Sequence, residues 1–206
     1  MRTVFETIVG SHMWKMQRKD SDRDHFVCYA APTKKILSGE LVYPVGFSSF
    51  AHEKGEDTSA HEAQTVVDQL IKGNVNFLWG VMSPVVVKTS RWHKELKEIV
   101  KRNLAKNCYN SIHGLAVHNY KKYVESGRDM SEKRCNTIAR SALFGAMLLR
   151  YGRVEFIPFF GADPEDAKAM IASLDQAYKE SELPGRPNEA EFRNWLYRLR
   201  IAQLGR

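Results

Sequence analysis

The feature that most constrains the fold lies near the start of the chain, where two strand-like runs enclose a polar loop. Residues 3–9 are mostly β-branched or apolar, and the run stops at Gly10-Ser11, a strand-breaking pair. Residues 24–30 form a second run, apolar and rich in aromatics, that ends before Pro32. Two strands joined by a short polar loop predict a small β-sheet in the first third of the chain.

The rest of the chain is expected to be mainly helical. Residues 61–72 carry apolar side chains at the spacing of one helical face, and Ser59 to Glu62 match a capping box. Amphipathic patterns recur in five later segments, at 91–106, 111–123, 131–151, 164–178 and 188–204. A sheet followed by helices is an α+β arrangement. We expect a core at 1–90 and a helical extension at 91–206 that packs on it to form one compact unit.

Composition excludes several classes of protein. The chain is 43% hydrophobic and 27% charged, which is typical of a globular domain and unlike a disordered chain. No apolar run approaches the roughly 20 residues of a membrane span, and the first residues lack a signal-peptide core. We therefore expect no membrane partner and a cytoplasmic location. Three distant cysteines, Cys28, Cys108 and Cys135, predict reduced thiols and not a disulfide framework or a zinc site.

The charge of the chain indicates the type of ligand. Thirty-one Lys and Arg against 24 Asp and Glu give a net charge of +7, which fits a polyanion such as nucleic acid or a nucleoside triphosphate. The sequence contains no Gly-x-Gly-x-x-Gly, Walker loop, His-Glu-x-x-His or Gly-x-Ser-x-Gly. Dinucleotide redox chemistry, P-loop hydrolysis, zinc proteolysis and serine esterase chemistry are therefore disfavoured.

Two carboxylates at the start of the second strand are candidate metal ligands. Side chains alternate along a strand, so Asp22 and Asp24 project from the same face. Adjacent carboxylates repel each other, and a divalent cation between them keeps both ionised. Their oxygens suit Mg²⁺ or Mn²⁺, and Mg²⁺ is usually held by one or two carboxylates together with substrate phosphates. The pattern predicts a metal–nucleotide site, although Asp-Ser-Asp is also common in solvated turns.

The turn after the first strand is the candidate phosphate-binding element. Gly10 and Ser11 can offer backbone N–H groups and a hydroxyl to phosphate oxygens. Glycine is needed there because a Cβ would hold the backbone away from the ligand. His12 follows directly, and either contacts phosphate or fixes the loop.

This order of motifs resembles the DNA polymerase β-type nucleotidyltransferase superfamily, and more narrowly its members with a Gly-Ser-His start and an Asp-Ser-Asp-x-Asp block. Here the two motifs are Gly10-Ser11-His12 and residues 20–24. Later segments resemble the family in the same order, at 29–33, 70–76, 82–84, 111–116 and 181–184. The resemblance implies a polymerase β-like fold, in which a small mixed sheet within residues 1–90 carries the active site.

The resemblance also implies an activity, the two-metal transfer of a nucleoside monophosphate from ATP or another triphosphate to a hydroxyl, with release of pyrophosphate. Asp22 and Asp24 would hold the metal ions. A third carboxylate on a neighbouring strand would help to activate the hydroxyl. Asp57 is the best match by position, and Glu56 is the fallback. The other role open to Asp57 is that of a charge beside a helix start.

The resemblance adds two basic residues to the expected nucleotide site. Lys133 and Arg140 are seven positions apart, on one face of a predicted helix, and could reach the triphosphate. Trp14 in the polar loop is a candidate contact for a nucleobase or the acceptor.

The acceptor and the degree of activity stay open at this level. The basic charge favours an RNA 3′ end, while a protein hydroxyl and a small molecule are also compatible with the superfamily. Residues 13–16, Met-Trp-Lys-Met, are bulkier and more basic than the stretch usual in the family. The alternative function is therefore a catalytically weakened nucleotide- or RNA-binding module on the same fold.

Overall fold

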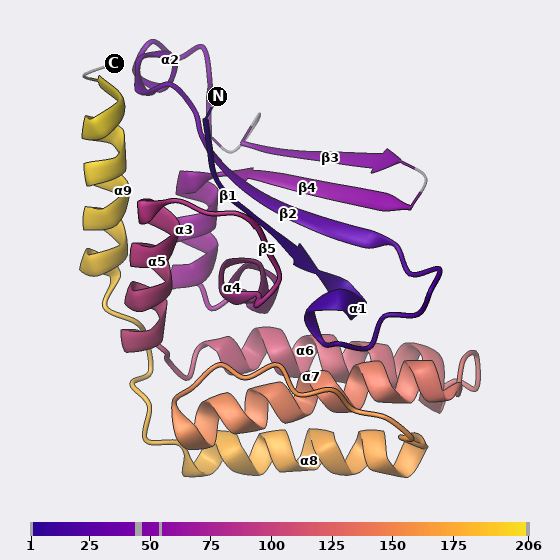
Figure 1. The fold of residues 1–206 in the computed structure, drawn as a ribbon. Helices are drawn as coiled ribbons and strands as arrows, with labels where there is room; N and C mark the ends of the chain where they lie inside the picture. The colour runs from indigo at the N-terminus through magenta and orange to yellow at the C-terminus, as the bar shows by residue number, and fades with distance from the viewer. Residues whose placement is uncertain (1, 44–46, 54, 205–206) are drawn as a thin grey trace. The chain divides into compact units, whose positions relative to one another are not determined.

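The computed structural model describes residues 2–43, 47–53 and 55–204 (Figure 1). Within these ranges the fold is α+β, as predicted, with one five-stranded mixed sheet and a majority of helical residues. The strands are β1 (Arg2–Val9), β2 (Arg23–Ala30), β3 (Ser48–Glu53), β4 (Glu56–Glu62) and β5 (Val86–Lys88). The helices are α1 (Gly10–Met13), α2 (Thr33–Leu37), α3 (Ala63–Ile71), α4 (Val75–Met82), α5 (Arg91–Arg102), α6 (Cys108–Asn119), α7 (Glu132–Tyr151), α8 (Pro164–Glu180) and α9 (Glu189–Leu204), with a π-helical turn, η1 (Tyr120–Glu125).

The strand order is β3-β4-β2-β1-β5. Strands β2 and β4 are parallel, and the other three neighbouring pairs are antiparallel. A parallel pair needs a connection that crosses back to the same end of the sheet. Here α2 and the edge strand β3 lie between β2 and β4 in the chain. This crossover brings the starts of β2 and β4 to the same end of the sheet.

One face of the sheet is covered by α3, α4 and α5 (Figure 1). Phe5 on β1 packs against Phe26 on β2, with ring centroids 6.1 Å apart, and stacks on His93 of α5 at 4.1 Å. Helix α4 approaches the strands closely, because the Thr7 hydroxyl donates to the Gly80 carbonyl at 2.7 Å. A Cβ at Gly80 would collide with the ring of Phe26. The core of this part of the molecule therefore lies between the sheet and these helices.

Helix α3 begins differently from the prediction. The expected capping box used Ser59 as the cap, but Ser59 lies within β4, which continues to Glu62 because it pairs with β2 up to that residue. Glu62 itself is the N-cap and accepts a hydrogen bond from the Gln64 N–H at 2.6 Å. The predicted capping box was therefore wrong, because strand pairing determines where this helix starts.

The chain forms two compact units. The first contains residues 1–72, 76–102 and 188–206, and the second contains 73–75 and 103–187. The sheet unit thus includes α5 and α9, in which the Trp195 indole N–H donates to the Trp92 carbonyl at 3.1 Å. The expected division at residue 90 into a catalytic core and an extension stays a prediction.

The second unit is helical. Helix α7 contributes many of the buried residues of this unit, including Ile138 and Leu148. It packs on both α6 and α8. It ends at Gly152 in the left-handed conformation, with φ +60°. None of the helices in the described residues combines the length and apolar character needed to cross a membrane. The three cysteines are buried and free, as predicted.

Candidate active site

Three strand ends bring the predicted carboxylates together. Val9, the last residue of β1, pairs with Asp24 near the start of β2, and Asp24 in turn pairs with Asp57 in the parallel strand β4. Neighbouring strands are about 4.8 Å apart, and residues in register point to the same face of a sheet. Asp24 and Asp57 are therefore immediate neighbours across two strands, although 33 positions separate them in the sequence.

The register distinguishes Asp57 from the fallback residue. Glu56 pairs with Arg23, so both belong to the face opposite that of Asp24 and Asp57. Of the two acids proposed for the third carboxylate, Asp57 is the one beside Asp24. Its catalytic role stays a prediction.

Asp22 and Asp57 are close enough to Asp24 for their charges to affect its pKa. Asp22 is exposed and directly precedes β2, while Asp24 is half-buried. The pKa of Asp24 is raised above its usual value, first by burial and then by the negative charges of Asp57 and Asp22; His12 and His25 oppose the shift. Repulsion among these carboxylates means that the site favours positive charge.

Gly10 contacts this cluster in a way that the sequence did not reveal. Its φ is +63°, a left-handed conformation that favours glycine. A Cβ built on Gly10 would overlap the Oδ2 atom of Asp24. Glycine was expected here to let the backbone approach a ligand, and the structure adds that it lets the backbone approach the Asp24 carboxylate.

The loop between β1 and β2 is shaped by its own hydrogen bonds. The carbonyl of Ser11 in α1 accepts from the Met16 N–H beyond the helix at 3.0 Å, and His12 Nε2 lies 3.5 Å from the Ser21 carbonyl. The Ser21 hydroxyl accepts from the Arg18 N–H at 2.8 Å. His12 therefore contacts the loop through the Ser21 carbonyl, and it also opposes the rise in the pKa of Asp24. Phosphate binding by Gly10, Ser11 and His12 stays a prediction.

Trp14 does not line the site. Its side chain is only 1% exposed and packs edge-on against Trp79, with ring centroids 5.5 Å apart. The neighbouring Met13 is buried as well. The predicted nucleobase contact at Trp14 is therefore wrong: the polar loop around it gave the appearance of a surface residue, while its indole fills the core.

The two basic residues expected at the triphosphate both lie on α7, in the second unit. Lys133 is exposed. Arg140 is largely buried, and burial lowers the pKa of its guanidinium to about 10. Their roles in nucleotide binding stay predictions.

Sequence reasoning missed one residue of the site. His52 on β3 is directly opposite Asp57, and its Nδ1 lies 2.9 Å from Asp57 Oδ1. Residues 48–53 are too polar to be identified as a strand from their pattern, so nothing local linked His52 to an aspartate. Only the β3–β4 pairing reveals the contact.

The donor set fits a hard divalent cation supplied with a substrate. No group of three or more His, Cys, Asp or Glu side chains in the described part of the chain forms a ready-made metal site. A Mg²⁺ ion, however, usually takes one or two protein carboxylates and completes its shell with water and substrate phosphates. Asp22 and Asp24 offer such oxygens. The pKa of Asp24 is raised first by burial and then by the charges of Asp57 and Asp22, and a cation would offset the repulsion among these carboxylates.

Comparison with known proteins identifies the family of the chain. The family model described as RlaP, the RNA repair pathway DNA polymerase beta family, matches residues 1–178, which include the whole sheet and all three aspartates. No curated protein matches the chain. Because the match extends over most of the sequence, the chain belongs to the RNA repair pathway DNA polymerase beta family, within the polymerase β-type nucleotidyltransferase superfamily.

Proposed function

We propose that the protein is a Mg²⁺- or Mn²⁺-dependent nucleotidyltransferase that moves a nucleoside monophosphate from a triphosphate to an acceptor hydroxyl and releases pyrophosphate. The observation that carries the proposal is the position of Asp24, in register with Asp57, two residues after Asp22 and against the backbone of Gly10. The family's RNA repair description and the net charge of +7 both favour an RNA 3′ end as the acceptor.

Each carboxylate has a distinct task in this proposal. Asp22 and Asp24 hold the metal ions, which supply positive charge to the triphosphate and the leaving pyrophosphate when bound. Asp57 receives the proton of the acceptor hydroxyl. Since His52 contacts its Oδ1 atom, we assign this role to Oδ2. The acceptor oxygen bonds to the α-phosphorus as the bond from that phosphorus to pyrophosphate breaks.

The bulky residues after Gly10–His12 do not argue against activity. Their size suggested a catalytically weakened binding module, but Met13 and Trp14 are buried in the core and contribute to packing. Their burial removes this reason to prefer the binding module.

The test measures transfer of label from each of four α-labelled triphosphates to RNA, to total protein and to small molecules, with Mg²⁺ or Mn²⁺. RNA with an intact 3′ hydroxyl is compared with the same RNA oxidised at that end. We expect label on intact RNA only, and its loss in the Asp22→Ala, Asp24→Ala double variant. Asp20→Ala is the matched control, because Asp20 is an exposed acid of the same block.

Two results would oppose the proposal. Transfer that survives the loss of both aspartates would remove their role. RNA binding that depends on salt, persists without the aspartates and is accompanied by no transfer to any acceptor would favour the binding module. Label on protein or on a small molecule would retain the chemistry and change the acceptor.

A further inference from the structure

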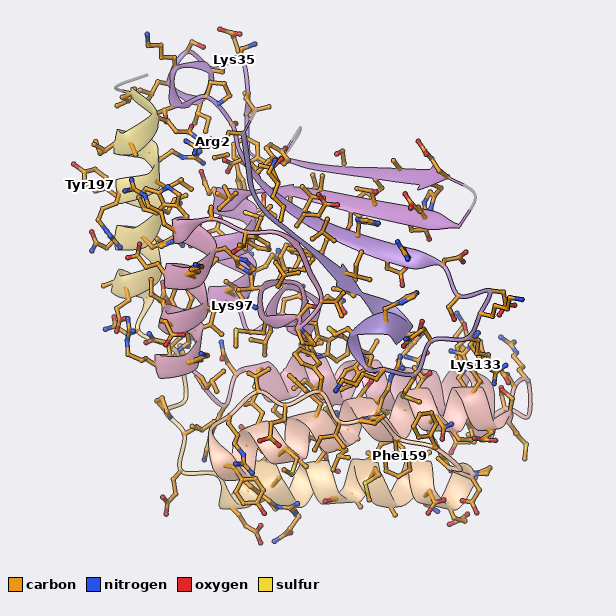
Figure 2. All side chains as sticks on the ribbon, in the orientation of Figure 1. Arg2, Lys35, Lys97, Lys133, Phe159 and Tyr197 are labelled. Atoms are coloured by element: carbon orange, nitrogen blue, oxygen red, sulfur yellow. The ribbon has the colours of Figure 1, made fainter. Side chains whose placement is uncertain are left out.

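A second pocket lies at the other end of β1, away from the aspartates. It is lined by the first residues of β1, by the start of α5 and by the last turns of α9, and its volume is about 330 Å³. In Figure 1 the N-terminal end of β1 lies beside α9, and Figure 2 labels Arg2 in this region. The length of β1, at about 3.3 Å per residue, separates this pocket from Gly10 by roughly 25 Å. Helix α9 also lies beyond the residues matched by the family model.

The pocket is basic. Its charged lining residues are Arg2 and Arg91, and none of its described lining residues is acidic. Neither arginine forms an ion pair within the described ranges. The arginines of α9 differ in this respect, and their partners are Asp68 for Arg193, Glu95 for Arg198 and Glu62 for Arg200. Two guanidinium groups without a carboxylate partner at one cavity favour an anion, and their planar N–H groups suit phosphate oxygens.

The start of α5 strengthens the positive potential. This helix has 12 residues and no acid in its first turn, and the Ser90 hydroxyl accepts from the His93 N–H at 3.3 Å. Ser90, Arg91 and Trp92 all line the pocket, so the positive end of the helix dipole lies at its wall.

An unsatisfied acceptor lies in the same wall. The Oε1 atom of Gln203 is buried without a hydrogen-bond partner among the described residues, and Gln203 lines the pocket. A buried acceptor without a donor is costly, and a rotation of the Gln203 amide towards the pocket would let a ligand hydroxyl or N–H group satisfy it. Sulfate and chloride carry no such donor at neutral pH, whereas the hydroxyl groups of a ribose and the N–H groups of a base do.

A wider groove continues from the pocket along α9. It has a volume of about 520 Å³ and shares Arg91, Trp92 and Ala202 with the pocket. Tyr197 and Ile201 line it and are 63% and 50% exposed. Figure 2 labels Tyr197 on the outer side of α9. Exposed aromatic and apolar groups beside arginines are typical of surfaces on which bases stack.

We propose that this pocket is a second nucleotide site, in which Arg2 and Arg91 bind a phosphate group, Gln203 accepts from the ribose or base, and the Tyr197 groove receives an aromatic base. The ligand is a phosphorylated nucleoside, either a free mononucleotide or a nucleotide within an RNA strand. The site is separate from the proposed transfer reaction, so its test does not require that the reaction occurs.

The experiment measures binding to the full chain carrying Asp22→Ala and Asp24→Ala, without divalent metal, so that the first site is silenced. Calorimetry compares AMP with adenosine, and fluorescence anisotropy follows a short labelled single-stranded RNA. Arg2→Ala, Arg91→Ala and Gln203→Glu are each introduced into this background. Lys94→Ala is the matched control, since Lys94 is an exposed cation of α5 that lines neither cavity.

We expect AMP to bind at least about tenfold more tightly than adenosine, and each pocket variant to weaken AMP by about tenfold or more, because each loses or opposes a charge-assisted contact. Lys94→Ala should change the affinity by less than about twofold. If RNA binds and AMP does not, with the same dependence on the arginines, the ligand is an RNA strand, and each arginine lost should lower the salt slope by about 0.7.

The proposal is overturned if neither AMP nor RNA binds this background, or if binding is the same in all three pocket variants as in the control. Arg2 and Arg91 are exposed, so their variants should unfold at the temperature of the parent, which circular dichroism checks. Should one of them fail to fold, Gln203→Glu still tests the site, because a carboxylate there repels phosphate. If no transfer to RNA occurs but binding still depends on the two arginines, the proposed reaction is rejected and this site is retained.

Discussion

Substitution of Gly10 by alanine tests whether the close approach of the backbone to Asp24 is required for the site. Two separate effects follow from the structure. The φ of +63° is unfavourable for any residue with a Cβ, and the new Cβ would overlap Asp24 Oδ2. The first effect acts on stability alone, whereas the second displaces the carboxylate that we assign to the metal.

The two effects have different magnitudes. A non-glycine residue in the left-handed region costs about 1–2 kcal/mol, and the less flexible unfolded chain returns about 0.4–1 kcal/mol of this. A net backbone cost of about 1 kcal/mol lowers the melting temperature of a chain of this size by about 2–4 °C, and the overlap with Asp24 Oδ2 adds to this cost. Displacement of a catalytic group by about 1 Å can reduce the rate by about 100-fold. We therefore expect a modest loss of stability and a large loss of activity.

Gly39→Ala is the matched control. Gly39 has a φ of +76°, and no described atom lies within 4 Å of the position that a Cβ would take there, so it shares the backbone cost without the contact. Thermal unfolding and single-turnover transfer are measured for both variants. A second arm compares Gly10→Ala with and without Asp24→Ala, because removal of the Asp24 carboxylate should reduce the stability cost at Gly10 to that at Gly39.

The reasoning fails if Gly10→Ala retains activity within about threefold of the parent, which is far less than a displaced carboxylate predicts. It also fails if Gly39→Ala loses as much activity, or if the cost of Gly10→Ala is the same in the Asp24→Ala background. In each case the approach of Gly10 to Asp24 would be incidental.

Three further predictions concern charge and packing. Asp24→Asn should raise the melting temperature at pH 7, because the folded state raises the pKa of Asp24 above its usual 3.8 and so disfavours the ionised form. The sign follows from linkage: the folded protein binds more protons, so wild-type stability falls as pH rises through this range. The gain in Asp24→Asn should shrink towards pH 4, and a gain independent of pH would contradict this. Arg200→Ala should destabilise the protein by about 3–5 kcal/mol in urea unfolding, because it leaves the fully buried Glu62 carboxylate without its two 2.7 Å contacts. The double variant with Glu62→Met and Arg200→Met should recover only part of this loss, because it removes the unpaired charge but also the acceptor of the Ala31 and Gln64 N–H groups. A loss larger than that of Arg200→Ala would refute the explanation. Trp14→Ala should cost about 3–5 kcal/mol and leave triphosphate affinity unchanged at a temperature where it is folded. Weakened affinity without loss of stability would restore Trp14 as a ligand contact.

Much of the candidate site is predictable because it is local in the sequence. The two-residue period of a strand predicts a shared face for Asp22 and Asp24, although β2 begins only at Arg23, and Gly10 directly follows the strand that pairs with Asp24. The amphipathic helical patterns are similarly local, and they correctly indicated a sheet followed by helices. Such features depend on residues a few positions apart, so one sequence is enough to find them.

The choice between the adjacent acids Glu56 and Asp57 could not be predicted from local sequence. Either could have been the third carboxylate, and a shift of one residue in the pairing of β4 would exchange their faces. The parallel register with β2 brings Asp57 beside Asp24 and turns Glu56 away. That register depends on pairing between segments more than 30 residues apart, and no pattern within either segment encodes it.

The sequence alone determined the α+β class, the paired aspartates and the strand-breaking glycine, because each arises from short-range periodicity and backbone chemistry. Tertiary structure decided which acid joins them, through the register of β4, and that Trp14 is a core residue. It also decided that α9 returns to the sheet unit, where Arg200 reaches Glu62 across 138 positions of the chain. These outcomes depend on which distant surfaces bury one another, and burial is a property of the folded chain rather than of any segment within it.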